Sequence, residues 1–306
     1  MNILITGGAG FIGSHIVDAY IRQGHRVVVL DNLSSGKRKQ VPEQAVFIHG
    51  DILDGKIEEI FEREKFNAIN HHAAQISVTH SVDNPVHDAE VNILGSLKLL
   101  QLAVKYRVKR FMFASTGGAL YGDQETFPAT EDHPRQPTSP YGLSKLAVEN
   151  YLPYYQKTFG LATVALRYSN VYGPRQDPHG EAGVVAIFCK QLQRGERPRI
   201  FGDGEQTRDF VSVTDVVQAN TALLSSDLSG AFNVGTGRET SVNDLARVLI
   251  GLAGTGVRPE HLSSRLGEQR RSAIDGGKLA GALGWRPRMP LEQGLLETYD
   301  FFRYQL

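Results

Sequence analysis

Short apolar runs alternate with amphipathic stretches along the first half of the chain. Five runs are typical of buried strands, at residues 3–5, 27–30, 46–48, 68–70 and 110–114. Between them, apolar side chains recur at the spacing of a helix face over residues 14–22, 55–64 and 86–106. Strands that alternate with helices through short connections predict an α/β fold, with a doubly wound parallel sheet and helices on both faces.

A further helix is expected to begin at Ser139 and Pro140. Serine is a good N-cap because its hydroxyl can accept a bond from a free backbone N–H of the first turn, and proline suits the first helical position. The sequence therefore predicts a helix that starts at Pro140 and runs to about residue 158.

Beyond about residue 170 the regular alternation loosens. Prolines interrupt it at 174, 178 and 198, and glycine turns stand at 202–204 and 235–237. We expect a first domain over residues 1–170 and a smaller mixed α/β substrate-binding domain over residues 171–306. No change of composition marks a linker, so the two are interleaved and the boundary is approximate.

Charge and cysteine content exclude several classes of protein. The 306 residues carry 33 acidic and 33 basic side chains, so bulk electrostatics would not gather nucleic acid or a membrane surface. No segment approaches the roughly 18 uncharged apolar residues of a membrane span. Cys189 is the one cysteine, which excludes an intrachain disulfide. The apolar N-terminus has no basic region before it, so we expect a cytoplasmic protein without a signal peptide.

Glycine is in excess, with 32 residues where average usage predicts about 21. Part of the excess forms the pattern G-x-x-G-x-x-G, from Gly7 to Gly13, between a predicted strand and a predicted helix. Glycines there permit a tight turn and let a pyrophosphate approach the backbone, while the helix N-terminus offers free N–H groups to the anion. The context predicts a dinucleotide site.

Asp31 closes the next predicted strand, about 20 residues further on. A carboxylate there accepts hydrogen bonds from a ribose 2′-hydroxyl and repels a 2′-phosphate, which favours NAD over NADP. The basic residues 37–39 could indicate the reverse preference. They lie several residues past the acid, and a solvated loop is the simpler interpretation of them.

Tyr141 and Lys145 stand four residues apart, on one face of the helix expected to begin at Ser139. A free phenol has a pKa near 10 and is a poor base at neutral pH, but a nearby ammonium favours the phenolate. Lowering that pKa by about 3 corresponds to roughly 4 kcal/mol. Such a change needs a partly desolvated site and the positive nicotinamide ring as well as Lys145.

The strand at 110–114 runs into Ser115, Thr116, Gly117 and Gly118. Ligands bind at the carboxyl edge of an open α/β sheet. A hydroxyl at this edge could bond the oxygen that is being deprotonated and share the proton with Tyr141.

These three features together resemble the extended short-chain dehydrogenase/reductase family and, within it, the UDP-glucose (UDP-galactose) 4-epimerase-like nucleotide-sugar enzymes. The resemblance runs from residue 2 to about residue 303. It implies a Rossmann-type sheet with NAD as cofactor. Further motifs that carry it lie at residues 31–36, 72–74, 92–96, 166–175, 206–210 and 283–287.

The resemblance also implies which residues would hold NAD. They come from the glycine turn, from the ends of the following strands, and from the tyrosine helix. They are Gly7, Gly10, Phe11, Ile12, Gly13, Asp31, Asn32, Ser35, Gly36, Asp51, Ile52, His72, Ala73, Ala74, Asn92, Tyr141, Lys145 and Tyr168.

In the catalytic roles that the resemblance implies, Tyr141 is the acid/base, and Lys145 lowers its pKa and holds the nicotinamide ribose. Many family members have a third serine as the catalytic hydroxyl where this chain has Gly117. We therefore assign that role to Thr116, with Ser115 as the second candidate. Ile76 is another departure, because well-known epimerases carry a lysine there.

The same segment helps to choose the reaction. Related 4,6-dehydratases and decarboxylases carry an extra acid where this chain has Gly117 and Gly118. What remains is oxidation and return reduction at carbon 4 of the sugar, as in a UDP-glucose/UDP-galactose 4-epimerase. The alternatives are an epimerase of UDP-N-acetylglucosamine or of a UDP-uronic acid, a 4,6-dehydratase with relocated acids, and a catalytically silent NAD-binding regulator.

The resemblance implies substrate contacts in the second half as well as at Thr116 and Tyr141. Ser272 matches a pocket-wall position where a small side chain suggests room for an N-acetyl sugar. The further substrate residues are Asn170, Val184, Val185, Arg208, Arg265 and Glu268.

The resemblance further implies a homodimer through a four-helix bundle built from residues 86–106 and 140–158, which carry Leu97, Leu100, Leu152 and Tyr155. Core packing accounts for part of this apolar surface. His71 and His72 would face opposite sides of a strand, so no metal site is expected there.

Overall fold

The predicted parallel sheet is the centre of the structure, a computed structural model that describes residues 1–179, 183–264 and 269–304. In that part of the chain the sheet has seven strands in the order β11-β6-β5-β4-β1-β2-β3. The pairs β1–β2, β1–β4, β2–β3 and β4–β5 are parallel. The strands are β1 (Asn2–Thr6), β2 (Arg26–Asp31), β3 (Val46–His49), β4 (Ala68–His71), β5 (Arg110–Thr116), β6 (Ala162–Tyr168) and β11 (Gly230–Val234).

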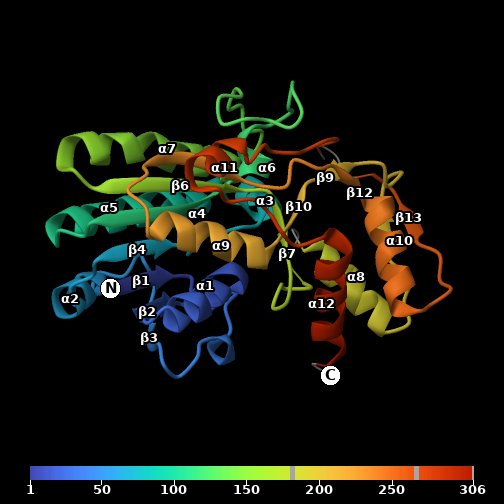
Figure 1. Cartoon of the computed structure of the whole chain (residues 1–306), viewed down its shortest axis with the longest axis horizontal. Helices are drawn as coiled ribbons and strands as arrows, with labels where there is room; N and C mark the ends of the chain where they lie inside the picture. Colours follow the sequence, from blue (N-terminus) through green and yellow to red (C-terminus); the bar gives the residue numbers. More distant parts are fainter. Residues whose placement is uncertain (180–182, 265–268, 305–306) are drawn as a thin grey trace. The chain divides into compact units, whose positions relative to one another are not determined.

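Helices follow the strands as predicted for a doubly wound sheet, and Figure 1 shows α5 and α7 running side by side. Side chains of alternate strand residues such as Leu4 and Phe111 form one buried core with Leu100 of α5 and Leu152 of α7. The helices of this region are α1 (Phe11–Arg22), η1 (Arg38–Gln40), α2 (Ile57–Glu64), α3 (Val78–Asp83), α4 (Pro85–Ala89), η2 (Glu90–Leu94), α5 (Gly95–Lys105), α6 (Gly117–Leu120), α7 (Pro140–Phe159) and α9 (Val213–Leu224).

The chain forms two compact units. The first comprises residues 1–120, 137–167 and 217–232, and the second comprises residues 121–136, 168–216 and 233–306. The chain therefore passes between the units repeatedly, and neither unit is one continuous range of residues.

The second unit has three two-stranded sheets in the part of the chain that the structure describes. Its helices α8, α10 and α12 pack around a core that includes Phe188, Leu245 and Leu295. Its elements are β7 (Asn170–Tyr172), α8 (Val184–Gln193), β8 (Arg199–Phe201), β9 (Thr207–Arg208), β10 (Phe210–Ser212), β12 (Thr240–Ser241), α10 (Val242–Ala253), β13 (Glu260–Leu262), α11 (Gly277–Leu283) and α12 (Leu291–Arg303).

Helix α7 begins where the sequence predicted. The Ser139 hydroxyl accepts a hydrogen bond from the Gly142 N–H at 3.2 Å, and Pro140 is the first helical residue. The helix ends at Gly160, whose φ of 69° is left-handed, a conformation that glycine adopts at little cost. Both ends of the helix that carries Tyr141 and Lys145 are therefore fixed by local sequence.

Two expectations need correction. The strand at 46–48 was expected to be buried, but β3 is the edge of the sheet and Val46 is 37% exposed, because only one neighbour covers it. The single helix expected over 86–106 is three segments, in which the π-helical turn η2 separates α4 from α5. Apolar periodicity does not reveal a π-turn. The turn contains one extra residue, but the apolar and polar residues on either side of it keep their helical spacing.

Candidate active site

The glycine turn between β1 and α1 has no room for side chains at two of its positions. Gly7 has a φ of 68°, and a Cβ there would lie 2.6 Å from the Ala73 backbone nitrogen. A Cβ at Gly13 would lie 2.3 Å from the Gly7 carbonyl oxygen. Gly10 caps α1 without a side-chain hydrogen bond, so the first N–H groups of the helix are left for a ligand. This cradle fits the pyrophosphate of a dinucleotide.

Asp31 lies at the end of β2, as predicted, and faces the glycine turn. Its carboxylate accepts hydrogen bonds from the Ala9 N–H at 2.9 Å and from the Leu33 N–H at 2.8 Å. A Cβ at Gly36 would lie 2.9 Å from an Asp31 carboxylate oxygen, so the loop closes tightly around the acid. Two backbone donors thus orient Asp31, and its remaining lone pairs suit a ribose hydroxyl.

The basic stretch 37–39 is solvated, as expected, and all three of its side chains are exposed. The Arg38 guanidinium also lies 4.7 Å from the centre of the Phe47 ring and donates a hydrogen bond to the Val41 carbonyl at 2.8 Å. Arg38 is therefore anchored on the edge strand.

The remaining residues implied for NAD lie in the loops after the first strands, apart from Phe11 and Ile12 of α1, Asn92 of η2, Tyr141 and Lys145 of α7, and Tyr168. Asp51 accepts a bond from the Asn32 side chain at 2.7 Å, and Ile52 is buried. Tyr168 ends β6 and is 5% exposed. Ser35 is exposed, whereas Ala73 and Ala74 are partly buried after β4.

Two histidines lie at the end of β4, and both have a lowered pKa. His71 bonds the Thr6 hydroxyl at 2.7 Å and the Ser96 hydroxyl at 2.9 Å, and burial holds its pKa well below the usual range. Burial and the Lys145 charge lower the pKa of His72 to about 3. Both side chains are neutral near pH 7, and the described residues contain no group of side chains that could hold a metal ion.

Tyr141 and Lys145 lie in the first two turns of α7. The Tyr141 backbone N–H donates to the Ser81 hydroxyl at 3.2 Å. The Lys145 ammonium donates to the Ala114 carbonyl at 3.0 Å and lies 5.8 Å from the centre of the Tyr141 ring. The pair is thus joined to the end of β5, where the sequence placed the catalytic hydroxyl.

Burial changes the pKa values of both members of this pair. Burial lowers the pKa of Lys145 to about 8, although Asp88 and Glu149 counteract part of the effect. Burial and the Asp88 charge raise the pKa of Tyr141 above its ordinary value. Loss of hydration therefore outweighs the ammonium in the protein without cofactor, and the joint lowering of this pKa by Lys145 and the nicotinamide ring stays a prediction.

The structure separates the two candidate hydroxyls. Ser115 is 4% exposed and donates to the Glu149 carboxylate at 2.5 Å. Glu149 is also paired with Arg167 at 2.7 Å. Thr116, the next residue, points to the other side of the strand and is partly exposed, and its hydroxyl accepts a bond from the Ala119 N–H at 3.2 Å. The Thr116 hydroxyl can donate a hydrogen bond to a ligand, whereas the Ser115 hydroxyl already donates its hydrogen bond to Glu149.

Sequence reasoning missed a buried polar group behind α7. Asp88 is fully buried and accepts hydrogen bonds from Ser144, Gln75 and Asn92. Asn92, which the sequence assigned to NAD, bonds both the backbone N–H and the carbonyl of Gln75, at 3.0 and 2.9 Å. Ile76, next in the chain, is 57% exposed. The one available signal was an aspartate on a face of a predicted amphipathic helix, which does not reveal its partners.

The implied nucleotide-binding residues of the second unit lie on short strands and on α8. The Asn170 N–H in β7 donates to the Asp209 carbonyl at 2.9 Å. The Arg208 guanidinium in β9 donates to the Thr207 carbonyl at 2.8 Å. Val184 and Val185 begin α8, and Ser272 is 3% exposed. Arg265 and Glu268 lie outside the described residues.

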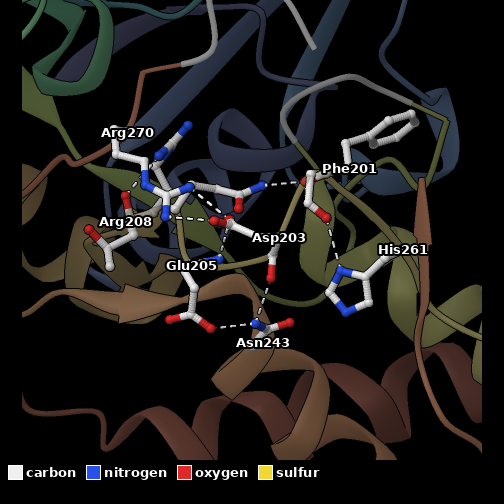
Figure 2. A network of polar contacts seen from close by, with 10 residues as sticks. Phe201, Asp203, Glu205, Arg208, Asn243, His261 and Arg270 are labelled. Atoms are coloured by element: carbon white, nitrogen blue, oxygen red, sulfur yellow. Dashed lines mark hydrogen bonds and ion pairs between the residues drawn. The ribbon is translucent and has the colours of Figure 1, made fainter. Parts of the chain in front are cut away.

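Figure 2 shows a polar network next to Arg208 that the sequence did not indicate. Arg270 pairs with Asp203 through two bonds, at 2.7 and 2.9 Å, and lowers the pKa of that carboxyl to about 2. Asn243 donates to the Asp203 carbonyl at 2.9 Å and to Glu205 at 2.6 Å. A Cβ at Gly204 would lie 2.1 Å from Asn243, so this turn requires glycine.

Every helix in residues 1–179, 183–264 and 269–304 falls short of the length and apolar character of a transmembrane span. Many of the exposed apolar side chains lie on α3, α4, η2 and α7. They include Val78, Val82, Val86, Leu94, Leu143, Tyr151 and Tyr154. The four residues singled out from the sequence are not among them, because Leu100, Leu152 and Tyr155 lie in the core and Leu97 is partly buried against it.

Known proteins share this sequence and fold over nearly the whole chain. A UDP-glucose 4-epimerase of Mycolicibacterium smegmatis is 43% identical over 309 residues, which is 99% of each chain. The crystal structure of a Thermotoga maritima UDP-glucose 4-epimerase with UDP-glucose superposes with a TM-score of 0.97 at 48% identity and covers 99% of each chain. The Thermus thermophilus UDP-glucose 4-epimerase, solved with NAD, has a TM-score of 0.95 at 44% identity and covers 100% of each chain.

The family model for NAD-dependent epimerases and dehydratases matches residues 3–235. That range includes the glycine cradle, the hydroxyl at the end of β5 and the tyrosine–lysine pair. The match confirms the resemblance to the extended short-chain dehydrogenases. The chain belongs to the NAD-dependent epimerase/dehydratase family.

Proposed function

We propose that the protein is an NAD-dependent UDP-sugar 4-epimerase that interconverts UDP-glucose and UDP-galactose. The observation that carries the proposal is the placement of Thr116, Tyr141 and Lys145 in the same compact unit as the glycine cradle. The names of the full-length relatives, and the UDP-glucose and NAD bound in two of the solved structures, support the same substrate and cofactor.

Residues 1–170 hold NAD in this proposal, and residues 171–306 hold the nucleotide sugar. The N-terminus of α1 and the backbone of Gly7 to Gly13 bind the pyrophosphate, and Asp31 binds the adenosine ribose. NAD, when bound, would accept a hydride, which is one proton with two electrons, from carbon 4 of the sugar and later return it. Lys145 holds the nicotinamide ribose in this proposal.

Tyr141 is the base for the 4-hydroxyl proton. Burial raises the pKa of its phenol in the protein alone, so deprotonation needs positive charge nearby. Lys145 supplies one such charge, and the positive ring of the cofactor supplies the other. Thr116 donates a hydrogen bond to the same sugar oxygen and so stabilises its developing negative charge.

The second half of the reaction reverses these proton movements. The 4-keto sugar turns over in the site, so that carbon 4 is reduced on the opposite face. Tyr141 then returns the proton to the 4-oxygen. Because cofactor and proton are both restored, the cycle needs no further reactant.

The residues that follow β5 argue against a dehydratase. Eliminating water needs a further acid/base pair near carbons 5 and 6, and Gly117 and Gly118 begin α6 without a side chain to supply it. The buried carboxylates nearest to Tyr141 and Lys145 are Asp88 and Glu149, and both are held by hydrogen bonds.

Asn170, Arg208, Arg265 and Glu268 bind the UDP moiety in this proposal, and Val184 and Val185 are further substrate contacts. A guanidinium holds a pyrophosphate through paired hydrogen bonds even though the net charge of the chain is zero. Ser272 leaves space beside the sugar, which favours UDP-N-acetylglucosamine as a second substrate.

The enzyme is a cytoplasmic homodimer in this proposal. The exposed apolar residues on α3, α4, η2 and α7 form a surface that a second copy would cover as a four-helix bundle. This surface differs from the core residues suggested by the sequence, but it belongs to the same two stretches of chain and to α3.

The experiment is to mix purified protein with UDP-galactose, first without and then with added NAD, and to look for UDP-glucose. Conversion supports the proposal, and no conversion under either condition contradicts it. A stable 4-keto-6-deoxy sugar among the products would indicate a dehydratase. Parallel assays with UDP-N-acetylglucosamine and UDP-glucuronic acid define the sugar preference. The Tyr141→Phe variant should be inactive, whereas a silent NAD-binding regulator would keep its function.

A further inference from the structure

Asp88 is a buried carboxylate whose bonded partners are all uncharged. Its two oxygens accept hydrogen bonds from the Ser144 hydroxyl at 2.6 Å and from the Gln75 and Asn92 side-chain amides at 2.9 Å each. The residue has no exposed surface. A fully buried carboxylate normally has a cation beside it or accepts hydrogen bonds that stabilise its charged form. Asp88 accepts three such hydrogen bonds.

Glu149, one turn beyond Lys145 on the same helix, makes the contrast clear. Arg167 donates to both of its carboxylate oxygens, at 2.7 and 3.1 Å, in an ion pair whose side chains are 4% and 3% exposed. The charge of Glu149 is therefore largely neutralised where it stands. Asp88 accepts bonds from uncharged groups instead, and its charge acts on Tyr141 and Lys145.

Three segments far apart in the sequence meet at Asp88. Ser144 lies in the first turns of α7, between Tyr141 and Lys145. Gln75 follows β4, and Asn92 lies in the π-helical turn η2. Because the Asn92 amide also clamps the backbone of Gln75, the carboxylate holds the start of α7 against the loop that adjoins the glycine cradle.

We propose that Asp88 is a positioning residue for the proton-transfer pair: it fixes the first turns of α7 through Ser144 and places a negative charge beside Tyr141 and Lys145. The inference rests on the proposed epimerase function and assigns Asp88 a part in it. Asp88 touches neither the sugar nor the cofactor in this role. It acts through α7.

The sign of the effect follows from the charge. A nearby carboxylate favours the protonated form of both partners, so Asp88 raises the pKa of Tyr141 and that of Lys145. It keeps Lys145 cationic despite burial, and it makes Tyr141 harder to deprotonate. The other ionisable groups around the pair are Glu149, compensated by Arg167, and the neutral His71 and His72.

The test is the pH dependence of kcat for UDP-galactose in the intact enzyme with NAD. In Asp88→Asn, which keeps the shape and removes the charge, both limbs of the profile should move to lower pH by about one pH unit. Asp83→Asn, the same change at an exposed position five residues earlier, should leave the profile in place. A folded Asp88→Asn enzyme with the wild-type profile would overturn the inference.

Ser144→Ala tests the contact separately from the charge. The variant keeps the Asp88 carboxylate and removes the hydrogen bond that joins it to α7. We expect kcat to fall about tenfold, whereas KM and the pH position of the profile should not change. If Asp88→Asn does not fold, this variant decides, because an unchanged kcat would show that Asp88 does not position α7. Failure of the wild type to convert UDP-galactose would overturn the proposed function and this inference together. Conversion without the expected shifts overturns the inference alone.

Discussion

The Ser115 hydroxyl donates a hydrogen bond to the Glu149 carboxylate at 2.5 Å, and this bond distinguishes Ser115 from the adjacent Thr116 at the end of β5. Ser115 belongs to a buried network with Arg167, whereas Thr116 points to the opposite side of the strand and is partly exposed. The order of preference that we gave to the two residues from the sequence thus has a structural reason.

Thr116→Ala should lower kcat by about 10²–10³, because one donor to the developing negative charge is lost. Ser115→Ala should mainly lower stability, by about 1–3 kcal/mol, because Glu149 loses a buried hydrogen bond. Steady-state kinetics and urea unfolding of both variants check this. A larger loss of kcat in Ser115→Ala than in Thr116→Ala would reverse the assignment.

Gly13→Ala should abolish retention of NAD. Its Cβ would stand 2.3 Å from the Gly7 carbonyl oxygen, so the backbone of the cradle must shift. The cofactor content of the purified protein and the Kd for NAD report the change. Gly251→Ala is the matched control, since nothing lies within 4 Å of a Cβ there and alanine favours the helix α10. Equal NAD content in the two variants would contradict the prediction.

Lys145 should cost stability at neutral pH. Burial lowers the pKa of Lys145 to about 8 from an ordinary 10.5, so the folded state holds the proton less tightly than the unfolded chain. The cost is fully present below pH 8 and is relieved as the pH rises from about 8 to 10.5.

Lys145→Met should therefore raise the free energy of unfolding by about 1–3 kcal/mol at pH 7 while kcat falls by at least about 10². The advantage should shrink as the pH approaches 10. Urea unfolding at pH 7 and pH 9.5 measures both effects, and a variant that is less stable at pH 7 would show that the bond to the Ala114 carbonyl outweighs the cost of burying the charge.

Tyr154→Glu should convert the proposed dimer into monomers. Tyr154 is 52% exposed on α7, and a carboxylate in the centre of an apolar interface would be desolvated without a partner. Light scattering gives the molecular mass of each variant. Leu296→Glu, at a 37% exposed position of α12 outside that surface, should keep the wild-type mass. The same mass for both variants would place the interface elsewhere.

The elements that local sequence determines were predicted well. The first five strands and α7 depend on apolar runs, on the Ser139 cap and on Pro140, all of which lie within a few residues of what they specify. The glycine cradle and Asp31 were found for the same reason, because a turn between a strand and a helix is a local feature.

What the sequence did not reveal depends on partners distant along the chain. Asp88 is bonded to Ser144, which is 56 residues away in the sequence, and to Gln75, which is 13 residues away. No sequence pattern around Asp88 predicts either contact. The raised pKa of Tyr141 in the protein alone also depends on the whole fold. The spacing of Tyr141 and Lys145 is visible in the sequence, but the burial that outweighs the ammonium is a property of the whole fold.

The π-helical turn Glu90–Leu94 makes the length of this segment as important as its composition. A π-turn amounts to one residue inserted into an α-helix. Deleting one residue beside Asn92 would let this wide turn close as a regular α-turn of 3.6 residues. Asn92 would then leave the Gln75 backbone and the Asp88 carboxylate, although every side chain of the network could still be encoded. A single-codon deletion at this point would therefore disconnect the start of α7 more completely than most substitutions.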